Sequence, residues 1–149
     1  MQLAAVTRAT VLRTARSGPD ADHALGLGAA HAVDHTGDLA AAVRSVAPDG
    51  VTAIVHAAGD GASLAALLRP GGRLASALGA TPEAVGRDDV AVAPMLATAP
   101  ADKVTSLLDS VAAGALTVPI TRTYAFDQAE QAVADFTGHK LGKLVVTIR

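Results

Sequence analysis

Residues 51–77 carry the sequence VTAIVHAAGDGASLAALLRPGGRLASA, which places a helix pattern between two strand patterns. Val51–Val55 is a β-branched run typical of a buried strand, Ala62–Arg69 has the alanine and leucine content of a helix, and Arg73–Ala77 is again strand-like. Pro70-Gly71-Gly72 is expected to end the helix, because a proline ring cannot continue helical hydrogen bonding. A strand, a helix and a second strand in this order are typical of two parallel strands in an α/β sheet.

The same alternation extends over the rest of the chain and predicts an α/β fold with a mostly parallel sheet. Further strands are predicted at residues 10–14, 32–34, 90–96, 120–124 and 144–148. Further helices are predicted at residues 2–8, from Asp20 to the glycines at 26–28, from Asp38 to the turn at 48–50, at 102–113, and from Asp127 to Gly138. Asp20 and Asp38 are expected to cap their helices, and Asp127 and Glu130 have the spacing of a capping box.

Composition narrows the class of protein. The chain has 149 residues, enough for one compact unit, and its 50% hydrophobic and 17% charged residues are typical of a globular protein. The formal net charge of −2, with no cluster of basic residues, argues against a nucleic-acid partner. No run approaches the roughly 20 apolar residues that span a bilayer, so we expect no membrane partner and a cytoplasmic protein. The absence of cysteine and the dispersal of five histidines argue against a metal site.

Three stretches in fixed order carry a family resemblance: LGLGAAHAVDH at residues 25–35, LLRPGGRL at 67–74 and GKLVV at 142–146. They resemble segments of the zinc-independent medium-chain dehydrogenases/reductases, in particular quinone-oxidoreductase-like and enoyl-reductase-like enzymes. The resemblance extends over nearly the whole chain. Its strength lies in the order and spacing of the three stretches, because a Pro-Gly-Gly turn before a strand also occurs in methyltransferases.

The resemblance implies a Rossmann-like, doubly wound sheet that binds a nicotinamide cofactor. The family's first strand and glycine-rich phosphate loop would precede Met1, and no G-x-G-x-x-G motif follows a strand within the chain. In the strand order 3-2-1-4-5-6 the missing strand lies between the strands at 10–14 and 51–55, so we expect two unpaired edges there. We therefore expect a truncated cofactor domain at residues 1–118. Residues 119–149 return to the catalytic domain in relatives, so their apolar face should be partly exposed here.

The resemblance places Arg16 and Ser17 after the family's second strand. An acidic residue there would accept hydrogen bonds from the ribose of NAD, whereas an arginine would meet the 2′-phosphate of NADP through its planar, bidentate guanidinium. The residues therefore favour NADP, with an exposed loop arginine as the alternative. His35 lies where the family often has an aromatic residue against the adenosine, and it is equally a candidate for an exposed histidine beside a turn.

Four more candidates follow the next two strands. Ala57 and Gly59 come after the strand at 51–55, where small residues would let a cofactor approach the backbone; an ordinary turn is the alternative. Leu78 and Gly79 come after the strand at 73–77 and correspond to the family segment that lines the nicotinamide end of the cofactor.

Lys143 resembles the family's C-terminal lysine, which reaches back to the cofactor, although a lysine that opens a strand is more often solvated. His56 and Tyr124 are interpreted as structural, because His56 stands alone and Tyr124 has no lysine four residues later. No catalytic residue is predicted, because the cofactor carries the reactive hydride and the protein supplies position and electrostatics.

The resemblance, together with Arg16 and Ser17, implies an NADPH-dependent oxidoreductase that reduces a quinone, or an enone or enoyl substrate, by hydride transfer. The chain would be its cofactor-binding portion and inactive alone. Two alternatives stay open: a non-catalytic remnant or mis-called fragment of such an enzyme, and a methyltransferase-like domain. Relatives commonly dimerise through the edge strand that corresponds to Val90–Leu96, so we expect a homodimer. Pro94 cannot donate to a ladder, which places this strand at a sheet edge or at a bend.

Overall fold

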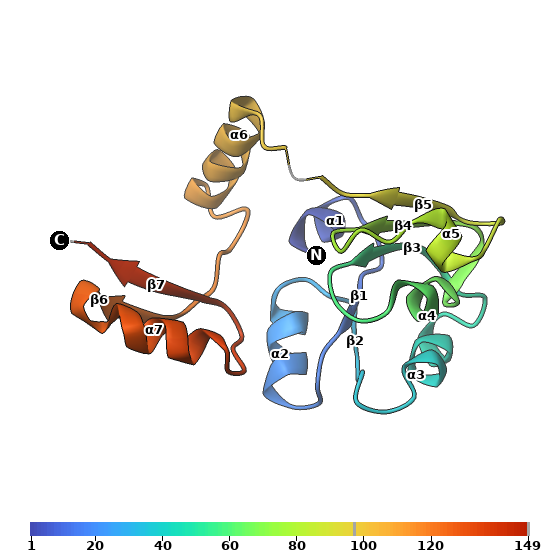
Figure 1. Ribbon diagram of the computed structural model, residues 1–149, viewed down its shortest axis with the longest axis horizontal. Helices are drawn as coiled ribbons and strands as arrows, with labels where there is room; N and C mark the ends of the chain where they lie inside the picture. Colours follow the sequence, from blue (N-terminus) through green and yellow to red (C-terminus); the bar gives the residue numbers. More distant parts are fainter. Residues whose placement is uncertain (97, 149) are drawn as a thin grey trace.

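A computed structural model of the chain describes residues 1–96 and 98–148. In this part of the chain the strands form three sheets (Figure 1). β1 (Leu12–Thr14) pairs with β2 (His31–Val33), β3 (Val51–His56) pairs with β4 (Leu68–Ser76), β4 pairs with β5 (Ala91–Pro94), and β6 (Ile120–Ala125) pairs with β7 (Lys143–Thr147). Every pair is parallel, which confirms the predicted α/β fold with parallel strands.

One helix precedes the first strand, and the others lie between successive strands. They are α1 (Gln2–Val6), α2 (Pro19–Gly26), α3 (Leu39–Val46), α4 (Gly61–Ala65), α5 (Pro82–Val85), α6 (Ala101–Ala112), the 3-10 helix η1 (Phe126–Gln128) and α7 (Ala129–Phe136). Figure 1 shows α3 and α4 on one side of the sheet β3-β4-β5, and β6, β7 and α7 standing apart beside α2. None of the helices among the described residues is long and apolar enough to span a bilayer.

The first two sheets are held together by side chains rather than by backbone pairing. No ladder joins β1 to β3 within the described residues, so each of these two strands has one edge without a ladder partner there. A buried cluster of Val33, Val43 and Leu67 joins β2, α3 and the segment before β4. Ile54 of β3 packs against this cluster and also against the core beneath β4. Aliphatic packing therefore sets how the two sheets lie relative to each other.

The helix predicted at residues 62–69 is too long. α4 ends at Ala65, and β4 begins at Leu68 because Leu67 O accepts a hydrogen bond from Val51 N at 2.9 Å, which brings Leu68 opposite Val51. Arg87 Nη1 donates to Ala65 O at 2.6 Å and to Leu68 O at 2.9 Å, so the carbonyls released at this point are satisfied. Burial and strand pairing thus outweigh the helix propensity of alanine and leucine.

Pro70-Gly71-Gly72 lies within β4 instead of ending a helix, at an irregularity where the register against β3 shifts. A further element, α5, is absent from the predictions. Its N-cap is Thr81, whose Oγ1 accepts a hydrogen bond from Ala84 N at 3.3 Å. Because α5 is a single turn, it carries no helical periodicity that sequence reasoning could detect.

The cap predicted at Asp20 is wrong. Gly18 is the N-cap of α2 and Pro19 follows it, a position that suits the fixed φ and the missing N–H of proline. Asp20 Oδ1 lies 2.9 Å from Nε2 of His139, a contact between α2 and the C-terminal segment. Asp38, by contrast, caps α3 as predicted and accepts a hydrogen bond from Ala41 N at 2.9 Å.

The capping box predicted for Asp127 and Glu130 is also wrong. The chain enters α7 through η1, and the side chain of Gln128 accepts a hydrogen bond from Ala125 N at 3.1 Å. Gln128 takes the reaching-back role that the prediction gave to Glu130, and Ala125 takes the N-cap position that the prediction gave to Asp127. The short 3-10 turn therefore places the capping interaction two residues earlier in the chain.

The C-terminal unit of β6, α7 and β7 contacts the rest of the chain through polar groups, such as His139 Nε2 at 2.9 Å from Asp20 Oδ1. Just before β6, Gln2 and Thr117 form a reciprocal pair in which Gln2 Nε2 donates to Thr117 O at 2.7 Å and Thr117 N donates to Gln2 Oε1 at 2.8 Å. Large apolar side chains of this unit are exposed, among them Phe126 at 66% and Phe136 at 62%. The predicted exposure of apolar surface in this segment is therefore confirmed.

Gly142 lets β7 approach the start of β6. A Cβ atom at this position would lie 2.5 Å from Pro119 O, the oxygen that accepts a hydrogen bond from Lys143 N at 2.8 Å. We expect Gly142→Ala to lower the free energy of unfolding of the chain by about 1 to 3 kcal/mol, because backbone must move to admit the methyl group.

The matched control is Gly138→Ala, at a position where the new Cβ would be 3.4 Å from its nearest neighbour, Asp135 O. This change should alter the free energy of unfolding by less than about 0.5 kcal/mol. Urea denaturation of both variants provides the measurement. Equal stability of the two would contradict the close approach at Gly142.

Candidate functional site

Most predicted site residues follow the carboxyl end of a parallel strand, the edge at which open α/β sheets bind ligands. Arg16 and Ser17 follow β1, His35 follows β2, Ala57 and Gly59 follow β3, and Leu78 and Gly79 follow β4. The structure links them through two hydrogen-bonded clusters, one in each of the first two sheets. We call these the Asp34 cluster and the His56 cluster.

The Asp34 cluster consists of Asp34, Ser17 and Thr36 and connects the ends of β1 and β2. Asp34 Oδ2 accepts hydrogen bonds from Ser17 N at 3.1 Å and Ser17 Oγ at 2.6 Å. Asp34 Oδ1 accepts from Thr36 N at 2.8 Å and Thr36 Oγ1 at 2.6 Å. The hydrogen bonds from Ser17 and then Thr36 hold the pKa of Asp34 far below its ordinary value, so the carboxylate stays ionised.

Arg16 and Ser17 therefore differ in what they offer a ligand. The only hydroxyl proton of Ser17 is donated to Asp34, so this side chain has no donor left in the conformation observed. Arg16 is exposed, and within the described residues its guanidinium makes no hydrogen bond or ion pair. His35 is also exposed, directly after Asp34.

The His56 cluster connects the ends of β3 and β4. His56 is 4% exposed and Ser76 is fully buried. His56 Nδ1 lies 3.0 Å from Ser76 Oγ, and His56 Nε2 lies 3.1 Å from Gly59 O. Ser76 Oγ also accepts hydrogen bonds from Leu78 N at 3.2 Å and Ala80 N at 2.9 Å. The cluster thus ties together the turns that carry the candidates of β3 and β4.

Gly59 and Gly79 both have a left-handed backbone, with φ of 83° and 76°. No heavy atom outside the neighbouring residues lies within 4 Å of the position that a Cβ would take at either glycine. The backbone of both turns is therefore open to a ligand. Ala57 and Leu78 are exposed beside these glycines.

Lys143 lies away from the other candidates. It opens β7 in the third sheet, its side chain is exposed, and its backbone N bonds Pro119 O. Among the described residues, no other predicted site residue belongs to this sheet.

Tyr124 is held by a structural network in the same sheet. Its OH donates to Asp135 Oδ2 at 2.6 Å, which raises the pKa of Tyr124 and lowers the pKa of Asp135. Arg122 Nη1 donates to the same oxygen at 2.8 Å, and the Arg122 guanidinium lies 5.1 Å from the centre of the Tyr124 ring. A tyrosine that is 3% exposed and engaged in this way fits its structural interpretation.

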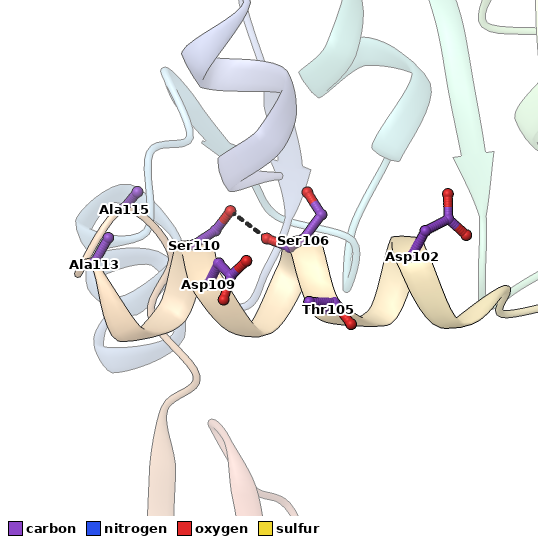
Figure 2. A pocket seen from close by; sticks show the side chains of 7 residues that line it. All are labelled: Asp102, Thr105, Ser106, Asp109, Ser110, Ala113 and Ala115. Atoms are coloured by element: carbon purple, nitrogen blue, oxygen red, sulfur yellow. Dashed lines mark hydrogen bonds between the residues drawn. The ribbon is translucent and has the colours of Figure 1, made fainter.

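One surface hollow lies away from the candidate residues and another lies at the Asp34 cluster. One of about 620 Å³ follows the polar side of α6, and Figure 2 shows Asp102, Thr105 and Asp109 along this solvent-facing helix. Ser110 Oγ donates to Ser106 O there, a bond within the helix. A second hollow, of about 440 Å³, lies between α2 and α3 along β2 and includes Asp34. Within the part of the chain that the structure covers, no three His, Asp or Glu side chains gather as metal ligands would.

Sequence reasoning missed three members of the clusters: Asp34, Thr36 and Ser76. Ser76 gave one signal, since it is a hydroxyl residue in an otherwise apolar strand end. Asp34 gave another, because it directly follows a strand and precedes a turn. The sequence gives no local sign of which residues pair, because Ser17 lies 17 residues from Asp34 and His56 lies 20 residues from Ser76.

Comparison with known families assigns the class of protein. The model of the zinc-binding dehydrogenase family matches residues 27–146, and the chain belongs to this family. The resemblance to medium-chain dehydrogenases/reductases, taken from three stretches of sequence, is confirmed. A search of the curated proteins found no match.

Solved structures share the fold. An NAD-dependent alcohol dehydrogenase is 20% identical with a TM-score of 0.83, over 99% of this chain and 46% of its own. A quinone oxidoreductase from Coxiella burnetii is 23% identical with a TM-score of 0.83, over 99% and 48%. The CurK enoyl reductase is 22% identical with a TM-score of 0.78, over 99% and 50%. The chain thus spans about half the length of these structures, and the likeness establishes its Rossmann-like fold.

The Asp34 cluster has a measurable signature. Its lowered pKa means that Asp34 adds stability that is fully present above the ordinary aspartate pKa of about 3.9 and is lost progressively as the pH falls from there through the lower folded value. We expect the amide resonances of Ser17 and Thr36 to stay unchanged as the pH is lowered through about 3.9. NMR titration tests this, with Asp34→Asn as the control. A transition of both amides near the ordinary value would contradict the cluster.

Proposed function

We propose that the chain is the cofactor-binding portion of an NADPH-dependent oxidoreductase that reduces a quinone or an enone or enoyl substrate without zinc. Membership in a dehydrogenase family supports the oxidoreductase class. Two of the similar structures are named as a quinone oxidoreductase and an enoyl reductase, which supports the substrate class. The chain contains no cysteine, so this portion offers no thiolate ligand for zinc.

The observation that carries the preference for NADPH is the exposed guanidinium of Arg16 at the carboxyl end of β1. Ser17 gives its proton to Asp34, which leaves Arg16 as the donor available to a 2′-phosphate. The nearby carboxylate of Asp34 has both oxygens engaged by Ser17 and Thr36, so it has little capacity left to accept from the ribose hydroxyls of NADH. These residues fit a phosphorylated ribose better than a free one.

The remaining candidates would orient the cofactor. The open turns at Gly59 and Gly79, with Ala57 and Leu78, would receive its nicotinamide half. Bound NADPH supplies the hydride, and the residues of this chain supply position. His35 would contact the adenosine, and Lys143 would act only if the C-terminal unit meets the cofactor.

We further propose two functional parts, a cofactor domain at residues 1–118 and a segment at 119–149 that packs on a catalytic domain. The exposed Phe126 and Phe136 support this division, because aromatic side chains are seldom left in solvent without a partner surface. Substrate contacts would come from that other domain, so the chain alone is expected to be inactive. The expected location of the protein is the cytoplasm.

Binding of NADPH and NADH to the purified chain tests this proposal. We expect Arg16→Ala to weaken NADPH binding roughly ten- to hundredfold, because a charge-assisted phosphate contact is lost, and to leave NADH binding within about twofold. Fluorescence titration and calorimetry give both constants. Arg69→Ala, which removes an exposed arginine at the amino end of β4, is the control and should change neither.

Two results would count against the proposal. Equal weakening of NADPH and NADH by Arg16→Ala would show that Arg16 does not read the 2′-phosphate. If the folded chain bound neither cofactor, a non-catalytic remnant would become the better interpretation.

We also propose that the protein forms a homodimer through the free edge of β5. Met95 N donates to Ser76 O at 2.7 Å, so alternate residues of the strand direct their amides away from β4. Pro94 lies at such an outward position, where its missing N–H costs no bond to β4. Ala91, Ala93 and Met95 are exposed, which leaves this apolar edge accessible to a second strand.

Introduction of a charge at this edge should prevent the association. We expect Ala93→Lys to convert a dimer into a monomer, because like charges would face each other across the pairing. Size-exclusion chromatography with light scattering measures the mass. Ala41→Lys on the exposed side of α3 is the control and should leave the dimer intact. A monomeric unmodified protein would overturn this part of the proposal.

A further inference from the structure

We propose that His56 and Ser76 are a positioning pair that holds the two turns of the nicotinamide half of the cofactor site in their binding conformation. The inference rests on the proposed function and adds two residues to its site. Neither side chain is exposed enough to touch a cofactor itself. They act through the backbone of the turns that follow β3 and β4.

The hydrogen bonds define where the protons lie. Gly59 O can only accept, so His56 Nε2 carries the ring proton and donates it. Ser76 Oγ accepts from Leu78 N and Ala80 N, which uses both of its lone pairs. Its own O–H therefore donates to His56 Nδ1. Every polar atom of the pair is satisfied when the imidazole is neutral with its proton on Nε2.

The pair leaves little freedom between the turns. Gly61, at the start of α4, lies so close that a Cβ there would be 3.0 Å from the Cβ of Ala80 and 3.2 Å from His56 Cε1. The turn after β3 is thus fixed through Gly59 O, and the turn after β4 through two of its amides. Gly79 lies between those two amides, with its left-handed backbone facing open space.

A purely structural role and a positioning role of Ser76 predict different losses of ligand affinity. A purely structural role predicts no selective loss for one half of the cofactor. Ser76 is fully buried, two residues after the core residue Leu74 in β4, and an apolar residue at such a position would have no polar group to satisfy. The Ser76 hydroxyl bonds a histidine and two turn amides. Its burial costs desolvation free energy, and its hydrogen bonds fix a specific turn geometry. A positioning role predicts loss of affinity for the half of the cofactor that these turns contact, and for no other part.

The test compares two ligands of the full chain, NADPH and adenosine 2′,5′-bisphosphate, which lacks the nicotinamide half. We expect Ser76→Ala to weaken NADPH binding about tenfold and to leave bisphosphate binding within about twofold. Ser76→Cys keeps a weak donor and acceptor and should restore part of the NADPH affinity. Thr81→Ala removes the cap of α5 in the next turn, and this destabilising control should weaken neither ligand.

The outcomes separate the two levels of the proposal. If the unmodified chain binds neither ligand, the proposed function fails and the inference fails with it. If it binds both and Ser76→Ala weakens both equally, or weakens neither, the inference alone is overturned. A long-range nitrogen NMR spectrum of the unmodified chain gives a test that needs no variant to fold. A His56 ring with its proton on Nδ1, or on both nitrogens, would overturn the arrangement at neutral pH.

Discussion

The contact of Val33, Val43 and Leu67 is the packing on which the rest of the described structure depends. It joins two sheets that share no backbone ladder within the described residues, so non-directional apolar burial sets their separation. Leu67 has a second role, because its carbonyl accepts from Val51 N and fixes the register of β3 against β4. One residue therefore links the placement of the sheets to the pairing within one of them.

At the carboxyl ends of these strands, hydrogen bonds fix the turns locally. Asp34 fixes the turns that follow β1 and β2, and Ser76 with His56 fixes those that follow β3 and β4. Each cluster lies within one sheet and does not depend on the other. The candidate site thus consists of two halves. Hydrogen bonds fix the geometry within each half, and apolar packing fixes the position of one half relative to the other.

The sequence allowed prediction wherever local pattern and tertiary structure agree. The Asp38 cap, the strand at residues 51–55 and the edge position of Pro94 all follow from local chemistry. Residues 66–69 could not be predicted, because the same leucines that favour a helix become strand residues once Leu67 pairs with Val51. Arg16 could be placed after its strand, but the contact of Ser17 with Asp34 depends on a register between β1 and β2 that no local pattern contains. His56 and Ser76 are both buried, and their contact joins residues 20 positions apart, which no local pattern indicates.

Pro94 has a consequence for how molecules of this kind associate. In the described residues the sheet β3-β4-β5 has two lateral edges without a ladder partner, one on β3 and one on β5. A sheet with two equivalent open edges is able to add copies of itself head to tail without limit, as in fibrous aggregation. Pro94 makes the edges unequal by removing a donor from only one of them. In the dimer proposed above, Pro94 would limit strand addition at β5 to a short pairing, which disfavours a growing filament.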